Sequence, residues 1–73
     1  MTDAKREREH LAQANRHIAQ AQKYIAEQKK LIEKLEREGQ EIEVAASMLR
    51  ALENALHAFE RHRELIMKRI DEE

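Results

Sequence analysis

The sequence contains no cysteine, no proline, no tryptophan, one glycine, one tyrosine and one phenylalanine among 73 residues. Without cysteine, neither disulfides nor thiolate metal sites can form. Strands have little to be built from, because aromatic and β-branched residues are few. A single glycine excludes a glycine-rich phosphate loop. No apolar run approaches the ~20 residues that span a bilayer, and no hydrophobic signal segment follows Met1. We therefore expect a cytoplasmic protein without membrane contact.

The residues that are abundant favour helices. The chain is 41% hydrophobic and 40% charged, and Ala, Leu, Glu, Lys, Arg and Gln predominate, which lose little on entering a helix. That mixture is typical of amphipathic helices and coiled coils. Residues 1–38 carry nine basic and seven acidic side chains, and residues 39–73 carry five basic and eight acidic. Neither half has the one-signed field typical of nucleic-acid binding. We expect an all-α protein.

Before the glycine, large aliphatic residues repeat every seven residues, and after it, apolar residues alternate at spacings of three and four. Such spacing predicts two helices with coiled-coil seams. In the first helix, heptad position a holds Leu11, Ile18, Ile25 and Ile32, and position d holds Glu7, Ala14, Ala21, Gln28 and Leu35. In the second, the seam holds Ile42, Ala45, Leu49, Leu52, Leu56, Phe59, Ile66 and Ile70, interrupted by Arg63.

Gly39 stands where a left-handed C-cap would end the first helix. The heptad phase also changes there. We predict one antiparallel hairpin over residues 1–73, with helices over about 3–38 and 41–71 and a turn at about 39–40. The alternative is one unbroken helix, because a mid-helix glycine costs only about 1 kcal/mol. No Ser, Thr, Asp or Asn is placed to cap a second helix.

Aligning Leu35 with Ile42 and Leu11 with Ile66 puts small residues opposite large ones along the hairpin. Two polar residues fall within this seam. Gln28 is interpreted as a residue that fixes register. Arg63 could anchor a carboxylate from a partner, but it is interpreted as reaching Glu7 or Glu60 near the open end of the hairpin.

A second apolar stripe lies beside the seam of the second helix. A wide apolar arc predicts a further packing partner, and a chain this short rarely gains more than about 3–5 kcal/mol from its own core. The stripe is nearly symmetric about Ala55, as a twofold contact requires. We predict a homodimer that forms an antiparallel four-helix bundle. The expected interface is Tyr24, Leu31, Val44, Met48, Ala51, Ala55, Ala58, His62 and Leu65.

Histidine is the first candidate for site chemistry. The expected register brings His17 opposite His62, and two facing imidazoles could bind Zn²⁺ or respond to pH. No pair with His-x-x-x-His spacing occurs, however, and we interpret both as boundary residues that reach solvent. Ser47 is the sole serine and the carboxylates alternate with Lys and Arg. We expect no metal, no cofactor and no enzymatic activity.

Residues 16–65 resemble a set of small, uncharacterised bacterial proteins. The matching elements are the RHIA motif at residues 16–19, Gln28 to Leu35, Gly39, Ala45 to Leu49, and the pair His62 and Arg63. The resemblance implies a helical hairpin and supplies no function.

The sequence thus predicts a non-catalytic protein–protein interaction or scaffold module, with a possible second protein partner. One alternative is a histidine-based metal- or pH-responsive sensor bundle. The other is a nucleic-acid accessory protein that uses Lys5, Arg6, Arg8 and Arg16. Glu7 and Glu9 interrupt that basic group and no aromatic platform accompanies it. We therefore expect no nucleic-acid partner.

Overall fold

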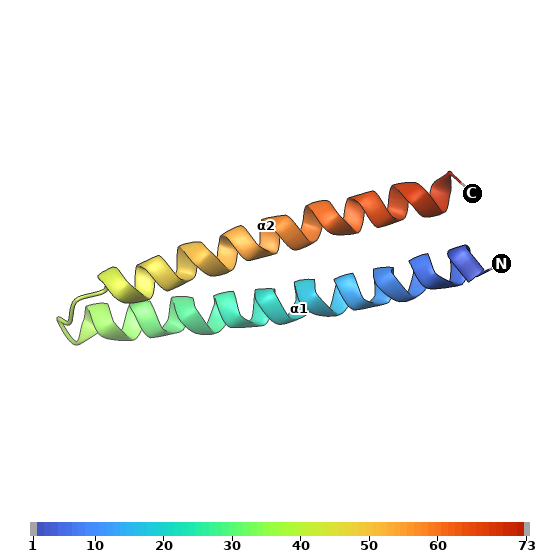
Figure 1. Ribbon diagram of the computed structural model, residues 1–73. Coiled ribbons are helices and arrows are strands. Elements are labelled where there is room, and N and C mark those ends of the chain that lie inside the picture. The colour runs from blue at the N-terminus through green and yellow to red at the C-terminus, as the bar shows by residue number, and fades with distance from the viewer. Residues whose placement is uncertain (1, 73) are drawn as a thin grey trace.

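The computed structural model describes the backbone of residues 2–72 and the side-chain surroundings of residues 4–72. Within that range it contains two helices, α1 (Thr2–Arg37) and α2 (Glu43–Asp71), and no strand. The helices run antiparallel, with both ends of the chain at one end of the hairpin and the connecting loop at the other (Figure 1). The Cα atoms extend 57 × 14 × 13 Å along the principal axes. The predicted helical hairpin is confirmed.

The chain reverses at Gly39, whose φ of 71° lies in the left-handed region. The amide of Gln40 donates to the carbonyl of Leu35 at 2.9 Å, and the amide of Gly39 donates to that of Glu36 at 3.1 Å. These two bonds form a Schellman motif, which satisfies carbonyls at the end of α1. The alternative of one unbroken helix through Gly39 is therefore wrong.

The connection is longer than the expected two residues, since residues 38–42 lie between the helices. The missing cap residue explains the late start of α2. Ile42 occupies the N-cap and makes no side-chain capping bond. Its carbonyl accepts from the amide of Ala46 at 2.7 Å. Glu43 in the first turn places negative charge at the positive end of the helix dipole.

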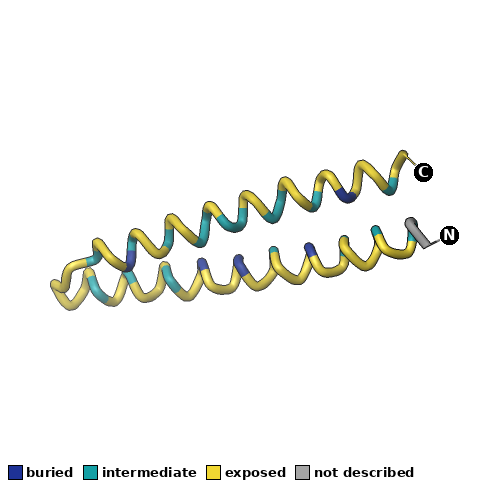
Figure 2. The backbone as a smooth tube through the Cα atoms, viewed as in Figure 1, coloured by how far each residue is buried: buried dark blue, intermediate teal, exposed yellow. Residues whose placement is uncertain are grey.

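The two helices pack through the predicted seam, and Figure 2 shows the buried residues facing the opposite helix. Small alanines allow the backbones to approach, and aliphatic side chains fill the layers between them. The buried residues are Ala14, Ala21, Ile25, Ala45 and Ile66, with Ile66 only 1% exposed. The half-buried apolar seam residues are Leu11, Ile18, Ile32, Leu35, Ile42, Leu49, Leu52, Leu56, Phe59 and Ile70.

Both polar seam residues have hydrogen-bond partners on the opposite helix. Gln28 Nε2 donates to the carbonyl of Ala45 at 2.9 Å, in a part-buried position. Arg63 Nε donates to Oδ1 of Asn15 at 2.6 Å, so an amide oxygen takes the place of the carboxylate expected from the sequence. These bonds offset the cost of withdrawing polar groups from water. Because each joins α1 to α2, each also favours one register.

Candidate functional site

The hairpin has one side that is apolar although it faces solvent. We define the apolar face as the nine residues expected at the interface: Tyr24, Leu31, Val44, Met48, Ala51, Ala55, Ala58, His62 and Leu65. Val44 is 84% exposed, Leu65 56% and Met48 53%. Tyr24 and Leu31 of α1 are also exposed, and only Ala55 is half-buried. The structure thus places the nine residues at the surface of one hairpin, available to a partner.

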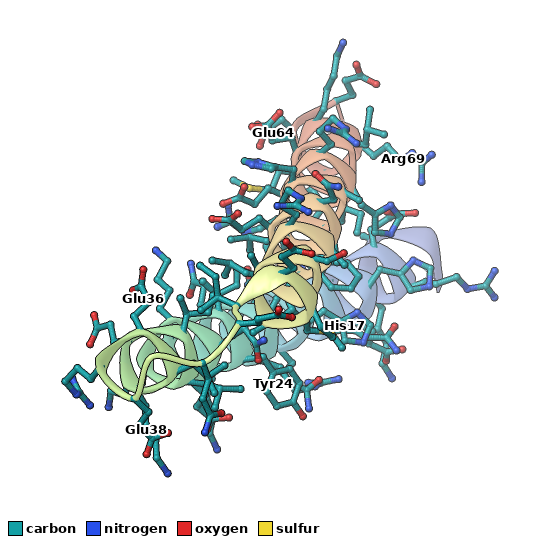
Figure 3. All side chains as sticks on the ribbon, turned by 90° about the vertical axis from the view of Figure 1, so that its left-hand side faces the viewer. His17, Tyr24, Glu36, Glu38, Glu64 and Arg69 are labelled. Atoms are coloured by element: carbon teal, nitrogen blue, oxygen red, sulfur yellow. The ribbon has the colours of Figure 1, made fainter. Side chains whose placement is uncertain are left out.

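The two sides of the hairpin differ in chemistry. Figure 3 shows His17 and Tyr24 on one side of the helix pair, whereas Glu36 and Glu64 project to the other. His17, Tyr24 and Leu31 recur at seven-residue intervals on α1, and they therefore follow one stripe of a coiled-coil helix. The hairpin is consequently two-faced: its helices bury one seam between them and leave a second unpaired.

The outer surface of α2 beside the seam is uncharged over four helical turns. The residues that share this surface between Val44 and Ala58 are Val44, Ser47, Met48, Ala51, Asn54, Ala55 and Ala58. They span about 120° of the helix at roughly 100° per residue. The rest of the outer surface carries Glu43, Arg50, Glu53, His57 and Glu60. In a chain that is 40% charged, a continuous face without charge stands out from the rest of the surface, and large exposed apolar patches are rare on monomers.

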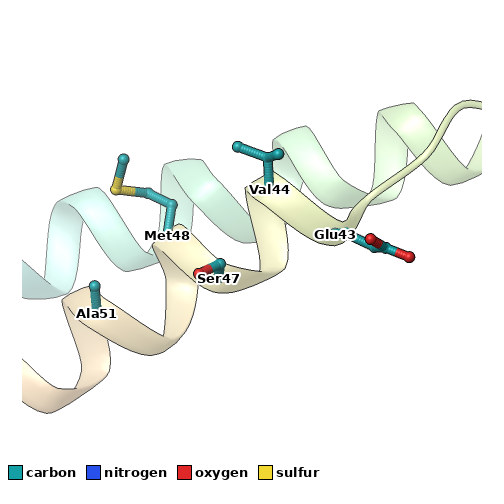
Figure 4. Close-up of a pocket in the computed structure, with 5 residues that line it drawn as sticks. All are labelled: Glu43, Val44, Ser47, Met48 and Ala51. Carbon is teal, nitrogen blue, oxygen red and sulfur yellow. The ribbon is translucent and has the colours of Figure 1, made fainter.

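Two shallow depressions interrupt the apolar face. The first lies along α2 and is lined by Glu43, Val44, Ser47, Met48 and Ala51. Figure 4 shows Val44, Met48 and Ala51 projecting from the same side of the helix. Because this depression is open and mostly apolar, it fits the side chains of another helix better than a small polar substrate.

The second depression lies where the helices meet. It is lined by His17, Gln20, Ala21, Tyr24, Leu52, Ala55 and Phe59. The amide of Gln20 donates to the hydroxyl oxygen of Tyr24 at 3.2 Å, which gives one edge a polar rim. Ala55 lies in this groove and on the apolar stripe of α2. A helix that covers Ala55 therefore also covers Tyr24.

Two of the histidines have a defined neighbour in the hairpin. The ring of His17 lies against Phe59, with ring centroids 5.3 Å apart. Phe59 precedes the expected neighbour, His62, by about one turn. His62 is exposed on the apolar face, and His57 Nδ1 lies 3.6 Å from a carboxylate oxygen of Glu60. Among the described residues, no group of three or more potential ligands could hold a metal ion.

The open end of the hairpin carries one ion pair between the helices. Arg69 Nη1 lies 3.9 Å from Oε1 of Glu7. Glu7 is mostly covered, and its other carboxylate oxygen is buried without a hydrogen-bond partner in the described structure. The Arg69 side chain is 62% exposed, so solvent weakens the pairing. Apolar packing therefore contributes most of the stabilisation between α1 and α2 at this end of the hairpin.

Comparisons with family models, with curated proteins and with solved structures give no match to this chain. The resemblance to small bacterial hairpin proteins therefore stays an interpretation of the sequence. Over the described residues, neither helix combines the length and apolar character needed to cross a membrane.

Proposed function

We propose that this protein is a non-catalytic interaction or scaffold module that acts as a homodimer, in which two hairpins form an antiparallel four-helix bundle. The observation that carries the proposal is the uncharged outer surface of α2 from Val44 to Ala58, continued across the groove by Tyr24 and Leu31 of α1. Withdrawing such an uncharged surface from water costs little free energy, and contact with a matching apolar surface is favourable.

One hairpin exposes more surface than a compact monomer of its mass, and the excess is comparable to the area that a dimer interface covers. One chain exposes 5934 Å², whereas a compact monomer of 8.7 kDa exposes about 4,700 Å². The excess is therefore about 1,200 Å² on this scaling. A stable dimer interface covers about 600–1,000 Å² on each partner. Pairing through the apolar face would thus remove most of the excess that two helices cannot bury alone.

The proposal is tested by the solution mass and by one charge placed on the apolar face. Light scattering should give about twice 8.7 kDa for the wild-type chain. Ala51→Glu should give monomers, because a carboxylate buried in an apolar contact costs several kcal/mol. Ala51 is exposed in the single hairpin, so the substitution leaves the seam between α1 and α2 intact.

Ala19→Glu is the matched control. Ala19 is also exposed in a helix, but it lies on α1 outside the apolar face. We expect this variant to remain dimeric. A monomeric wild-type chain, or a dimer that survives Ala51→Glu, would contradict the proposal.

The two alternative functions have less support. A metal-binding sensor bundle would need several ligands close together, whereas the described residues of one hairpin bring no group of three or more potential ligands together. A thermal stability that rises with added Zn²⁺, or an assembly lost between about pH 7 and 5, would favour this alternative. A nucleic-acid accessory protein would show an affinity that falls steeply with salt.

A further inference from the structure

We infer that α2 pairs antiparallel with α2 of a second copy, about a twofold axis that passes close to Ala55. This inference rests on the proposed homodimer and adds its geometry. The occupant of the apolar face is thereby specified as the same face of another chain, in reversed direction. Three features of the described residues support it: the size of the side chains along the stripe, the charges at its two ends, and the groove that it shares with α1.

The stripe is graded in size about its centre. Ala51, Ala55 and Ala58 form the middle, and larger side chains stand at both ends. Small residues allow two helices to approach closely, and larger residues then fill the space where the helices diverge. Met48 and His62 stand seven residues before and after Ala55. A twofold axis near Ala55 therefore brings each large residue opposite a large residue of the other chain.

The charges distinguish the antiparallel from the parallel pairing. Arg69 stands fourteen residues after Ala55 and continues the seven-residue spacing of His62, and Glu41 stands fourteen residues before Ala55, in the loop just ahead of α2. Antiparallel pairing brings this loop toward the partner's Arg69, twice in the dimer, and that arginine also lies 3.9 Å from Glu7 of its own chain. Parallel pairing would put Arg69 beside the partner's Arg69 and Lys68 beside the partner's Lys68. Like charges in register cost free energy, and opposite charges choose orientation.

The polar residues that border the stripe agree with the same orientation. Ser47, Asn54 and Arg61 follow one another at seven-residue intervals along its outer edge. In the antiparallel pair Ser47 lies near the partner's Arg61, and Asn54 lies near the partner's Asn54. No like charges meet along this border. In the parallel pair, Arg61 would meet the partner's Arg61.

The groove between the helices extends the contact to α1. Tyr24 and Ala55 line the same depression, so a helix laid against Ala55 also covers the ring of Tyr24. Leu31 stands two turns further along the same stripe of α1 and is 43% exposed. Leu31 and Met48 would together cover the part of the partner's α2 that lies beyond the twofold axis. Each hairpin thus contributes side chains from both helices to the contact.

The absence of native cysteine allows a direct test by single-cysteine cross-linking. Under mild oxidation, Ala55→Cys should form a covalent dimer with high yield. Val44→Cys should not link to itself, because its two copies would lie about 33 Å apart along the antiparallel pair at 1.5 Å per residue. A disulfide requires Cα atoms within about 7 Å. A mixture of Val44→Cys and Leu65→Cys chains should link efficiently.

Arg50→Cys is the control, because Arg50 is an exposed residue of α2 outside the stripe. It should stay unlinked at the same protein concentration. If Ala55→Cys does not fold, a mixture of Ala51→Cys and Ala58→Cys chains supplies the test, since these residues stand at nearly equal distances on either side of Ala55 and both are exposed in the single hairpin.

The outcomes separate the geometry from the proposed dimer. If Val44→Cys links to itself as well as Ala55→Cys does, α2 pairs in parallel and the inference is wrong, although the dimer stands. If light scattering shows a dimer and no cysteine on the stripe links in any combination, another surface forms the interface. A wild-type monomer would overturn both the geometry and the proposed function.

Discussion

Replacing Ile66 with alanine tests whether α1 and α2 pack together at the open end of the hairpin. Ile66 is 1% exposed, the most deeply buried side chain among those described. The substitution removes three carbons, and each buried methylene is worth about 0.8 kcal/mol. The transfer loss is therefore about 2.4 kcal/mol before any cavity is counted. Since two helices can partly close the gap, we expect a total of about 2–3 kcal/mol, at the lower end for such substitutions.

That loss is large for so small a protein. A single core in a chain of this length supplies about 3–5 kcal/mol, so Ile66→Ala should remove half of the free energy of unfolding or more. Circular dichroism at 222 nm, followed through a urea titration, measures the effect. With a slope near 1 kcal/mol per molar urea, the midpoint should fall by about 2–3 M. Wild type and variant are compared at one protein concentration, because association contributes to the apparent stability.

Met67→Ala is the matched control for Ile66→Ala. Met67 is the next residue in α2 and is 39% exposed. It also lies outside the apolar face. Because much of its side chain already meets water, we expect a loss below about 1 kcal/mol. Equal losses for the two variants would refute the packing of α2 on α1 at Ile66.

Two further substitutions test the loop and the polar seam by the same urea titration. Gly39→Ala should cost about 1–2 kcal/mol, because a residue with a Cβ disfavours the φ of 71° even though no atom lies within 4 Å of the added Cβ. Gly39→Asn should cost less. If the two variants lose the same free energy of unfolding, the backbone conformation is not the cause. Gln28→Ala should cost about 1 kcal/mol by removing the hydrogen bond to Ala45. The exposed Gln22→Ala is its control, and a Gln28 loss no larger than the control would show that the bond contributes nothing.

The sequence was sufficient to predict the hairpin because its signals are local and agree with one another. The heptad residues identify both helices, and Gly39 identifies the reversal. The bounds of the loop were less predictable. Without a capping side chain before Glu43, no single residue marks where α2 begins, and the backbone geometry of residues 40–42 decides it.

The candidate surface was predictable to a similar degree. The spacing of Val44, Met48 and Ala51 shows from the sequence that they share a face of a helix. Their exposure required the structure, since a second stripe beside a seam can also turn toward the neighbouring helix. Val44 at 84% and Met48 at 53% exposure show that the hairpin leaves this stripe uncovered.

Helical periodicity and the position of one glycine were thus determined by the sequence alone, because each depends on residues within a few turns of one another. The tertiary structure decided which side chains meet across the hairpin. The ring of His17 lies against Phe59, and Asn15 rather than a carboxylate receives Arg63. Such pairings depend on the rotation and offset of one helix against the other. A shift of a single turn, about 5.4 Å, changes every partner while leaving the heptad pattern intact.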